Sequence, residues 1–307
     1  MNTRLEKVLV AIHPGSTPST SVIDHARWLA ARLDGEMRFV SCLYDTVIAV
    51  GLVNEDDSAI AAQVGMVNTQ RQILDEIADS VDAVKCTVDS KVCWGIPYRD
   101  VIRDEARSWS ADLVIVGAPH PGIRTSIGLQ GFGMNLAPRC PCPVLLVKNA
   151  ETPRYDSILA AIDPLHRHNE PSGIDDRVLD AATQLARTTN SPLSVIHVYP
   201  NPESFELASS VEVLPGVHYG TENIESVHRE ATIEVAARYG ITTDSVHLAA
   251  GDPAENIADQ IRELRSDLIV LGAIKRGRLE EAILGSTAER VASEAECDVL
   301  LVGDEET

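Results

Sequence analysis

The stretch GAIKRGRLEEAILGST, from Gly272 to Thr287, combines the residue types that bind a phosphate group. Its glycines permit a close approach of the backbone, and Lys275 and two arginines supply positive charge. Gly285 and Ser286 come directly before a helical pattern, and the first N–H groups of a helix have no partner within it. The stretch therefore predicts a site for a polyphosphate. The alternative, in which Gly285 and Ser286 only begin and cap the helix, stays open at this point.

Two further residues stand where strands are expected to end. Asp163 follows the apolar run Ile158–Ile162, and Val198 lies near the end of the run Leu193–Tyr199. In an open parallel sheet, ligands bind beyond the carboxyl ends of the strands, so we expect both residues near Gly272. Taken alone, an aspartate such as Asp163 is a turn residue in most proteins.

The motifs of several other site classes are missing from the sequence. It has no G-x-x-x-x-G-K-[ST] loop, and no G-x-G-x-x-G follows the first strand. No G-x-S-x-G elbow or H-E-x-x-H helix occurs either. His166 and His168 are close in sequence, but no third metal ligand accompanies them, so a solvated loop is favoured and no metal site is predicted.

The elements that must position these residues occur twice, because the sequence contains an internal repeat. Four segments of the first half recur in the same order in the second, at an offset that drifts from about 150 to 156 residues. The paired segments are Lys7–Pro14 with Ser157–Pro164, Trp94–Ile102 with Ala250–Ala258, Ala111–Ala118 with Ser266–Ala273, and Cys142–Lys148 with Cys297–Gly303. We therefore predict two domains, residues 1–150 and 151–307, joined by a short linker at Glu151–Arg154.

Within each unit, short apolar runs alternate with amphipathic patterns. In the second half, strands are expected at 158–162, 193–199, 245–249, 267–271 and 298–302, and helices at 175–188, roughly 222–239, 253–264 and 286–294. Continuous Val, Ile and Leu runs predict a parallel sheet that helices cover on both faces. The expected fold class is α/β, with a five-stranded parallel sheet in each of two tandem Rossmann-like domains.

Composition limits the partners and the compartment. The formal net charge of −20 argues against a surface that binds nucleic acid. No apolar run reaches the roughly eighteen residues of a membrane-spanning helix, and the N-terminus is typical of a first strand rather than a signal peptide. The six cysteines lack the spacing of zinc or thioredoxin motifs, so free thiols in a reducing compartment are expected. We predict a cytoplasmic protein with Cys142 and Cys297 buried, and no membrane partner.

The motifs AAIDP, GDPAENI, SDLIVLG, LGSTAERV and CDVLLV, in this order, resemble the universal stress protein family in its tandem two-domain (E-type) branch. The resemblance covers essentially the whole chain. It implies a fold like that of the adenine nucleotide alpha hydrolases. Nucleotide-binding members carry the pattern G-x2-G-x9-G-[ST] at the loop, so the resemblance implies ATP, accompanied by Mg²⁺, as the ligand.

Carried to this sequence, the resemblance implies that Asp163 contacts the adenine and that Val198 frames the nucleoside. The middle glycine of the loop pattern is replaced by Lys275, which disfavours φ > 0 but whose ammonium can pair with a phosphate. The predicted ligand-binding residues are Asp163, Val198, Gly272, Lys275, Gly285, Ser286 and Thr287.

The first half departs further from the family pattern. His13 replaces the aspartate, Gln130 stands where Gly285 stands, and Gly131 stands where Ser286 does. An ordinary ATP site there would lack its adenine acceptor and its hydroxyl donors. We therefore expect the first domain to lack that site.

The final strands of the two units, Pro143–Lys148 and Asp298–Val302, are sheet edges that need covering. The resemblance implies that they pair antiparallel and join the two halves as an intramolecular pseudo-dimer. Further association into a homodimer is an open alternative.

The leading functional hypothesis is a cytosolic stress-response protein that binds ATP or another adenine nucleotide in its second domain and acts through protein partners. No general base or nucleophile is evident over a γ-phosphate, so the chain is not expected to be an enzyme, and any hydrolysis would be slow. One alternative is a scaffold whose ligand is not a nucleotide, with an apolar molecule held by the insert Asp45–Gly65. An ATP-pyrophosphatase is disfavoured, because the segment His13–Thr17 poorly matches the loop that such enzymes need.

Overall fold

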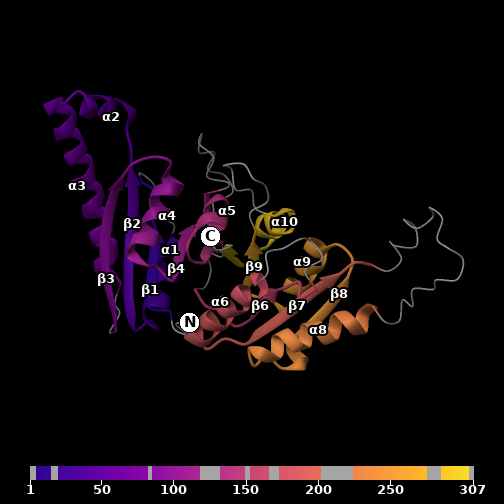
Figure 1. The fold of residues 1–307 in the computed structure, drawn as a ribbon. Helices are drawn as coiled ribbons and strands as arrows, with labels where there is room; N and C mark the ends of the chain where they lie inside the picture. Colours follow the sequence, from indigo (N-terminus) through magenta and orange to yellow (C-terminus); the bar gives the residue numbers. More distant parts are fainter. Residues whose placement is uncertain are drawn as a thin grey trace, which may run out of the picture.

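A computed structural model gives the fold of the chain (Figure 1). It describes residues 5–14, 20–81, 85–117, 132–148, 153–165, 173–201, 224–274 and 285–303. Strands and helices alternate along both halves, which confirms the α/β class predicted from the apolar runs.

The first half is built from strands that helices follow in turn. Its strands are β1 (Lys7–Ala11), β2 (Gly35–Leu43), β3 (Cys86–Trp94), β4 (Leu113–Gly117) and β5 (Val144–Val147). Its helices are α1 (Thr20–Ala30), α2 (Thr46–Val53), α3 (Asp57–Asp79), α4 (Tyr98–Trp109), α5 (Phe132–Leu136) and the 3-10 turn η2 (Ala137–Arg139).

The second half repeats this order. Its strands are β6 (Ile158–Ala161), β7 (Leu193–Tyr199), β8 (Val246–Ala250), β9 (Leu268–Ala273) and β10 (Asp298–Gly303). Its helices are α6 (Ile174–Thr189), α8 (Ile224–Arg238), α9 (Pro253–Leu264), α10 (Ser286–Glu294) and the 3-10 turn η4 (Thr243–Ser245).

All of these strands lie in a single sheet in the order β3-β2-β1-β4-β5-β10-β9-β6-β7-β8. Neighbouring strands are parallel within each half. The junction between the halves is the exception, because β5 and β10 pair antiparallel with Leu145 opposite Leu300. The expected pairing of the two final strands is therefore confirmed, and the two halves form a pseudo-dimer within one chain.

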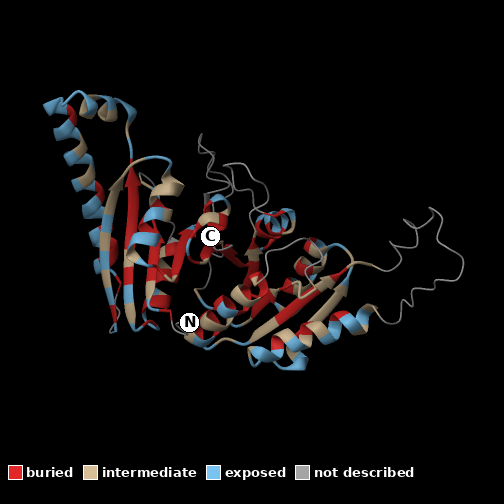
Figure 2. Cartoon of the chain, in the orientation of Figure 1, coloured by how far each residue is buried: buried red, intermediate tan, exposed pale blue. Residues whose placement is uncertain are grey.

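Helices cover both faces of this sheet (Figure 2). One apolar cluster joins the strands to residues of α1, α3 and α6, and a second joins the opposite face to residues of α4, α9 and α10. The strand side chains at the centre are buried, as the continuous Val, Ile and Leu runs predict. Cys142 and Cys297 lie in the second cluster, 6% and 5% exposed, as expected.

The turn after the third strand of each half shows how closely the repeat is kept. Gly95 has φ = 155° and Gly251 has φ = 127°, conformations that favour glycine, and the two residues match in the sequence repeat. In the second half, Asp252 then caps α9 by accepting a hydrogen bond from the N–H of Glu255 at 3.0 Å. The next residue, Pro253, begins the helix, where its missing N–H costs nothing.

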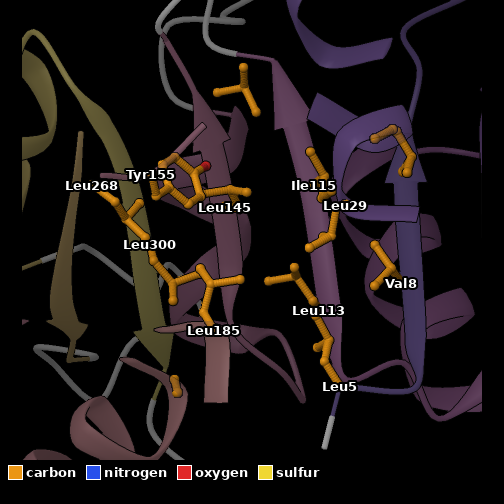
Figure 3. Packing of buried hydrophobic residues seen from close by; sticks show 14 of the residues in the cluster. Leu5, Val8, Leu29, Leu113, Ile115, Leu145, Tyr155, Leu185, Leu268 and Leu300 are labelled. Carbon is orange, nitrogen blue, oxygen red and sulfur yellow. The ribbon is translucent and has the colours of Figure 1, made fainter. Parts of the chain in front are cut away.

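Apolar packing at the centre of the sheet joins the two halves (Figure 3). Leu145 and Leu300 lie side by side on the two antiparallel strands. Tyr155, from the segment between the halves, is 4% exposed beside them. Its hydroxyl donates to the carboxylate of Asp298 at 2.9 Å, so one polar group is anchored inside this apolar junction.

The insert between β2 and β3 forms the helices α2 and α3, which extend beyond the sheet (Figures 1 and 2). Gly51 allows them to pack closely, because a Cβ at this position would lie 2.4 Å from that of Ala59. No residue of α2 is buried, and Val47 and Val53 are 81% and 84% exposed. Among the described residues, no helix combines the length and apolar character that a membrane crossing requires.

Candidate functional site

A cavity opens where the carboxyl ends of β6, β7 and β9 meet the first turns of α6, α9 and α10. Its volume is about 100 Å³. Sites that enclose a whole drug-sized ligand typically measure roughly 300–1,000 Å³. The cavity can therefore take one part of such a ligand, such as an aromatic base, while the rest lies outside it.

Four of the residues predicted from the sequence line this cavity: Asp163, Val198, Gly272 and Thr287. They come from three strand ends and one helix start, so the fold brings together residues that are up to 124 positions apart in sequence (287 − 163). The strand-end placement inferred for Asp163 and Val198 agrees with this geometry.

The other predicted residues are placed less directly. Gly285 is the residue before α10, with φ = −58° and ψ = 143°, a conformation open to any amino acid, and it is buried. Ser286 is exposed in the first turn of α10 and is not part of the cavity wall. Lys275 lies outside the described residues.

Gly272 permits a close approach of strand and helix. A Cβ at this position would lie 3.0 Å from Cγ1 of Ile174, in the first turn of α6, so a side chain here would crowd that turn. The same residue, Ile174, lines the cavity with Gly272. The small residue therefore keeps the end of β9 close to α6.

A second carboxylate, missed by sequence reasoning, stands beside Asp163. Asp175 lies in the first turn of α6 and is 6% exposed, and its Oδ1 accepts a hydrogen bond from the N–H of Asp163 at 3.0 Å. The only signal in the sequence is an acidic residue in a first helical turn, which is commonplace.

Acidic groups give this part of the cavity its polarity. Asp163 and Asp175 are the two ionisable side chains among the described lining residues. Carboxylates accept hydrogen bonds and repel phosphate, so this end of the cavity suits the amino group of a ligand. The start of α10, whose first N–H groups are at Ser286 and Thr287, is a part of the site that suits an anion.

A polar contact holds α10 against the start of α9, beside Pro253 of the cavity wall. Arg290 of α10 donates to both carboxylate oxygens of Asp252, at 3.0 and 2.9 Å. The N–H of Glu255 and this guanidinium hold the pKa of Asp252 below its usual value. The start of α10 is thus fixed relative to the residues that begin α9.

The corresponding region of the first half is arranged differently. Its first-strand end carries His13, which is exposed, in place of Asp163. Tyr98 reaches this end from α4, where its hydroxyl donates to the carbonyl oxygen of Ile12 at 3.0 Å and its ring lies 5.9 Å from that of His13. The residue that matches Tyr98 in the second half is Ala254. A bulky side chain thus stands in the first half where the second has a methyl group.

Within the described ranges, no three His, Cys, Asp or Glu side chains group together in a way that could hold a metal ion. His166 and His168 lie outside those ranges, as do Gln130 and Gly131 of the first half.

The model of the universal stress protein family matches this chain twice, at residues 4–148 and 154–303. Universal stress protein E of Salmonella typhi is 24% identical over 302 residues, which cover 98% of this chain and 95% of that protein. Universal stress protein E of Escherichia coli K12 is 23% identical over 298 residues, covering 97% and 93%.

Solved structures show the same fold over the full length. A putative universal stress protein from Pseudomonas aeruginosa UCBPP-PA14 superposes with a TM-score of 0.67 at 23% identity, covering 98% of this chain and 94% of that one. A universal stress protein from Archaeoglobus fulgidus DSM 4304 gives a TM-score of 0.67 at 19% identity, with 99% of both chains covered.

Proposed function

Since this chain belongs to the universal stress protein family, in its tandem two-domain branch, we propose that it binds an adenine nucleotide, ATP with Mg²⁺, in its second domain. The observation that carries the proposal is the cavity, which brings Asp163, Val198, Gly272 and Thr287 together at the carboxyl edge of the sheet. The domain boundary at 150/151 belongs to the same proposal.

The polarity of the cavity supports an orientation for the nucleotide. The amino group of adenine is placed toward the carboxylate of Asp163, and Val198 offers apolar contact to the nucleoside. The phosphates lie toward the first turn of α10, with Ser286 and Thr287 as donors and Lys275 as the balancing charge. Guanine presents a carbonyl oxygen where adenine presents an amino group, so Asp163 disfavours GTP.

The same side chains support binding rather than turnover as the proposed role. The described cavity holds two carboxylates at its adenine end and a threonine at its phosphate end, with no histidine in its wall. We therefore propose a protein that binds ATP, hydrolyses it slowly at most, and acts in the stress response through protein partners.

Isothermal titration calorimetry with ATP and GTP tests this function. We expect heat of binding with ATP and a thermal upshift that grows with ATP concentration. Asp163→Ala should reduce the preference for ATP over GTP. Ser286→Ala should weaken the binding of ATP more than the binding of adenosine. Asp244→Ala, an exposed residue of η4, removes the same charge elsewhere and serves as the matched control. Absence of heat and of any upshift with ATP at millimolar concentration would refute the proposal.

The exposed apolar side chains of α2 favour a second candidate function. Val47, Val50 and Val53 are 81%, 59% and 84% exposed on a helix without charged residues. Such a surface suits a scaffold that takes an apolar ligand or partner. Mass spectrometry of small molecules released on denaturing the purified protein distinguishes the two functions, because it identifies either an adenine nucleotide or an apolar compound.

A further inference from the structure

Two histidines are buried together directly behind the end of β6. His197 of β7 is 1% exposed and His228 of α8 is 0% exposed. Nε2 of His197 and Nδ1 of His228 lie 2.7 Å apart. Neither residue lines the cavity, but Nδ1 of His197 lies 3.8 Å from Oδ1 of Asp163, which does. Most buried polar groups in proteins are hydrogen-bonded, and Nε2 of His197 and Nδ1 of His228 are partners of each other.

The partners of His197 fix where its hydrogen sits. Its Nδ1 lies 3.0 Å from the carbonyl oxygen of Ile162, which can only accept, so Nδ1 carries a hydrogen. In the neutral ring, Nε2 then accepts, and the hydrogen between the two rings comes from Nδ1 of His228. The pair therefore forms a chain of two hydrogen bonds, in which His228 of α8 donates to His197 and His197 donates to the carbonyl oxygen at the end of β6.

The carbonyl held by His197 belongs to the same peptide unit as the N–H of Asp163. His197 donates to one end of that unit, the carbonyl oxygen of Ile162. Asp175 accepts from its other end, the N–H of Asp163. Because both ends are held, the rotation of this peptide is restricted, and so is the position of the backbone that carries the Asp163 side chain. His197 and Asp175 thus hold the backbone next to Asp163 from its two ends.

The first half satisfies the matching carbonyl in another way. There the carbonyl of Ile12 accepts from the hydroxyl of Tyr98. The register of the strands places Ser41 where the second half has His197. A phenol stays neutral around pH 7, whereas an imidazole changes its charge between about pH 5 and 8. The second half therefore carries a proton-sensitive donor at a position where the first half does not.

We propose that the His197–His228 pair is a positioning element for Asp163, and that protonation of the pair weakens binding of the adenine group. This inference rests on the proposed function. In the neutral pair, His197 holds the Ile162–Asp163 peptide and leaves the carboxylate to the ligand. Nε2 of His228 is the ring nitrogen of the pair without a hydrogen, so the added proton enters there. Transfer of the shared hydrogen from Nδ1 of His228 to Nε2 of His197 then moves the positive charge to the ring whose Nδ1 lies 3.8 Å from Oδ1 of Asp163. That charge competes with the amino group of adenine for the carboxylate.

Among the residues that the structure describes, the other charged and titratable groups around the pair come from the neighbouring elements. Asp175 and Asp176 lie in the first turn of α6. On the other side, the ring of Tyr199 stacks on that of His228 at 5.0 Å between centroids, and Glu225 and Arg229 of α8 lie near Tyr199. His247 lies on the adjacent strand β8, and burial lowers its pKa, so His247→Asn is the matched control for the loss of a titrating ring.

Binding of adenosine and of ATP, measured by calorimetry from pH 5.5 to 8.5, tests the inference. Adenosine has no phosphate that titrates in this range. For the wild type and for His247→Asn we expect the Kd for adenosine to rise at least about threefold as the pH falls. His197→Asn keeps a donor close to the Nδ1 position but cannot titrate, so its Kd should stay near the wild-type value at pH 8.5 and change little with pH. His197→Ala should weaken binding at least about fivefold at every pH.

Two results would overturn the inference: a His197→Asn profile that keeps the wild-type pH slope, or a His197→Ala protein that folds and binds as tightly as the wild type. If His197→Ala does not fold, Asp175→Ala tests the other end of the same peptide and should also weaken adenosine. If the wild type binds neither ligand at any pH, the proposed function fails. The ¹⁵N chemical shifts of the histidine rings then test the positioning role. A His197 ring that carries no hydrogen on Nδ1 at pH 8.5 contradicts that role.

Discussion

Replacing Asp298 by alanine tests what holds the two halves together. Its carboxylate is 0% exposed and has partners from three places in the chain. It forms an ion pair at 2.9 Å with His25 of α1, accepts from the hydroxyl of Tyr155 at 2.9 Å, and accepts from the N–H of Lys148 at 2.7 Å. Alanine would leave these three donors without this acceptor, and two of them, on His25 and Tyr155, are buried.

The expected cost follows from this burial. Removing one member of a buried ion pair destabilises a protein by about 3–5 kcal/mol, because the other charge remains in an apolar surrounding. Stabilities of folded domains are typically about 5–15 kcal/mol, so the loss is a large share. Asp298→Asn keeps the shape and one acceptor oxygen, so we expect a smaller loss from this matched variant.

The ion pair also predicts a pH dependence. Burial alone lowers the pKa of His25, but the contact with Asp298 outweighs it, and the pKa is raised above its ordinary value of 6.5. A group whose pKa is raised by folding contributes stability that is fully present below pH 6.5 and is lost as the pH rises through the folded-state pKa. The difference in stability between the wild type and Asp298→Asn should therefore shrink toward alkaline pH.

Urea unfolding at pH 5.5 and pH 8.5, followed by two signals, measures both effects. All three tryptophans lie in the first half, and the ring of Trp28 packs edge-on against that of Tyr155, 5.2 Å away. Fluorescence thus reports the first half and its junction, whereas circular dichroism reports both halves. In Asp298→Ala we expect the two transitions to separate. A loss of unfolding free energy below about 1 kcal/mol in Asp298→Ala at pH 5.5 would refute this reasoning. A difference in stability between the wild type and Asp298→Asn that grows with pH would refute it as well.

Three other substitutions have defined outcomes. Gly303→Ala places a Cβ 2.4 Å from a backbone oxygen of η2, so we expect a loss of about 1–3 kcal/mol in urea unfolding, and an unchanged midpoint would contradict that contact. Tyr98→Phe removes the hydrogen bond to Ile12 and should cost about 1 kcal/mol, measured as a lower Tm, while ATP binding in the second half stays unchanged. Val53→Ser, on an exposed side chain, should change stability by less than about 0.5 kcal/mol and reduce light scattering at high protein concentration.

Helix and strand positions follow from local signals wherever those signals are strong. The bounds of Pro253–Leu264, Ser286–Glu294 and Leu193–Tyr199 agree with the sequence prediction. The first of these helices has a capping aspartate and a proline at its start, and the strand is a continuous apolar run between polar residues. Other ends, such as those of β6 and β8, shift by one residue, because pairing with a neighbouring strand decides where a strand ends.

The surroundings of the predicted site could not be inferred in the same way. His197 and His228 are 31 positions apart, and only the packing of α8 on β7 brings their rings together. Asp175 looks like any acidic residue in a first helical turn until the fold places it on the N–H of Asp163. The exchange of Ala254 for Tyr98 is visible in the sequence repeat, but its effect depends on the direction of the phenol, which sequence spacing does not encode.

Covalent joining of the halves changes how the antiparallel junction of β5 and β10 responds to dilution. Two separate chains that met through such strands would come apart as their concentration fell, whereas here only the ten residues 148–157 separate the end of β5 from the start of β6. A tether this short gives an effective concentration in the millimolar range, which dilution of the protein does not alter. Each half therefore always pairs with the other half of the same chain, whose sequence differs from its own, and not with an identical subunit as in a homodimer. A loop or pocket residue can change in one half without the same change being imposed across the junction, and the two halves differ in this way at Tyr98 and Ala254.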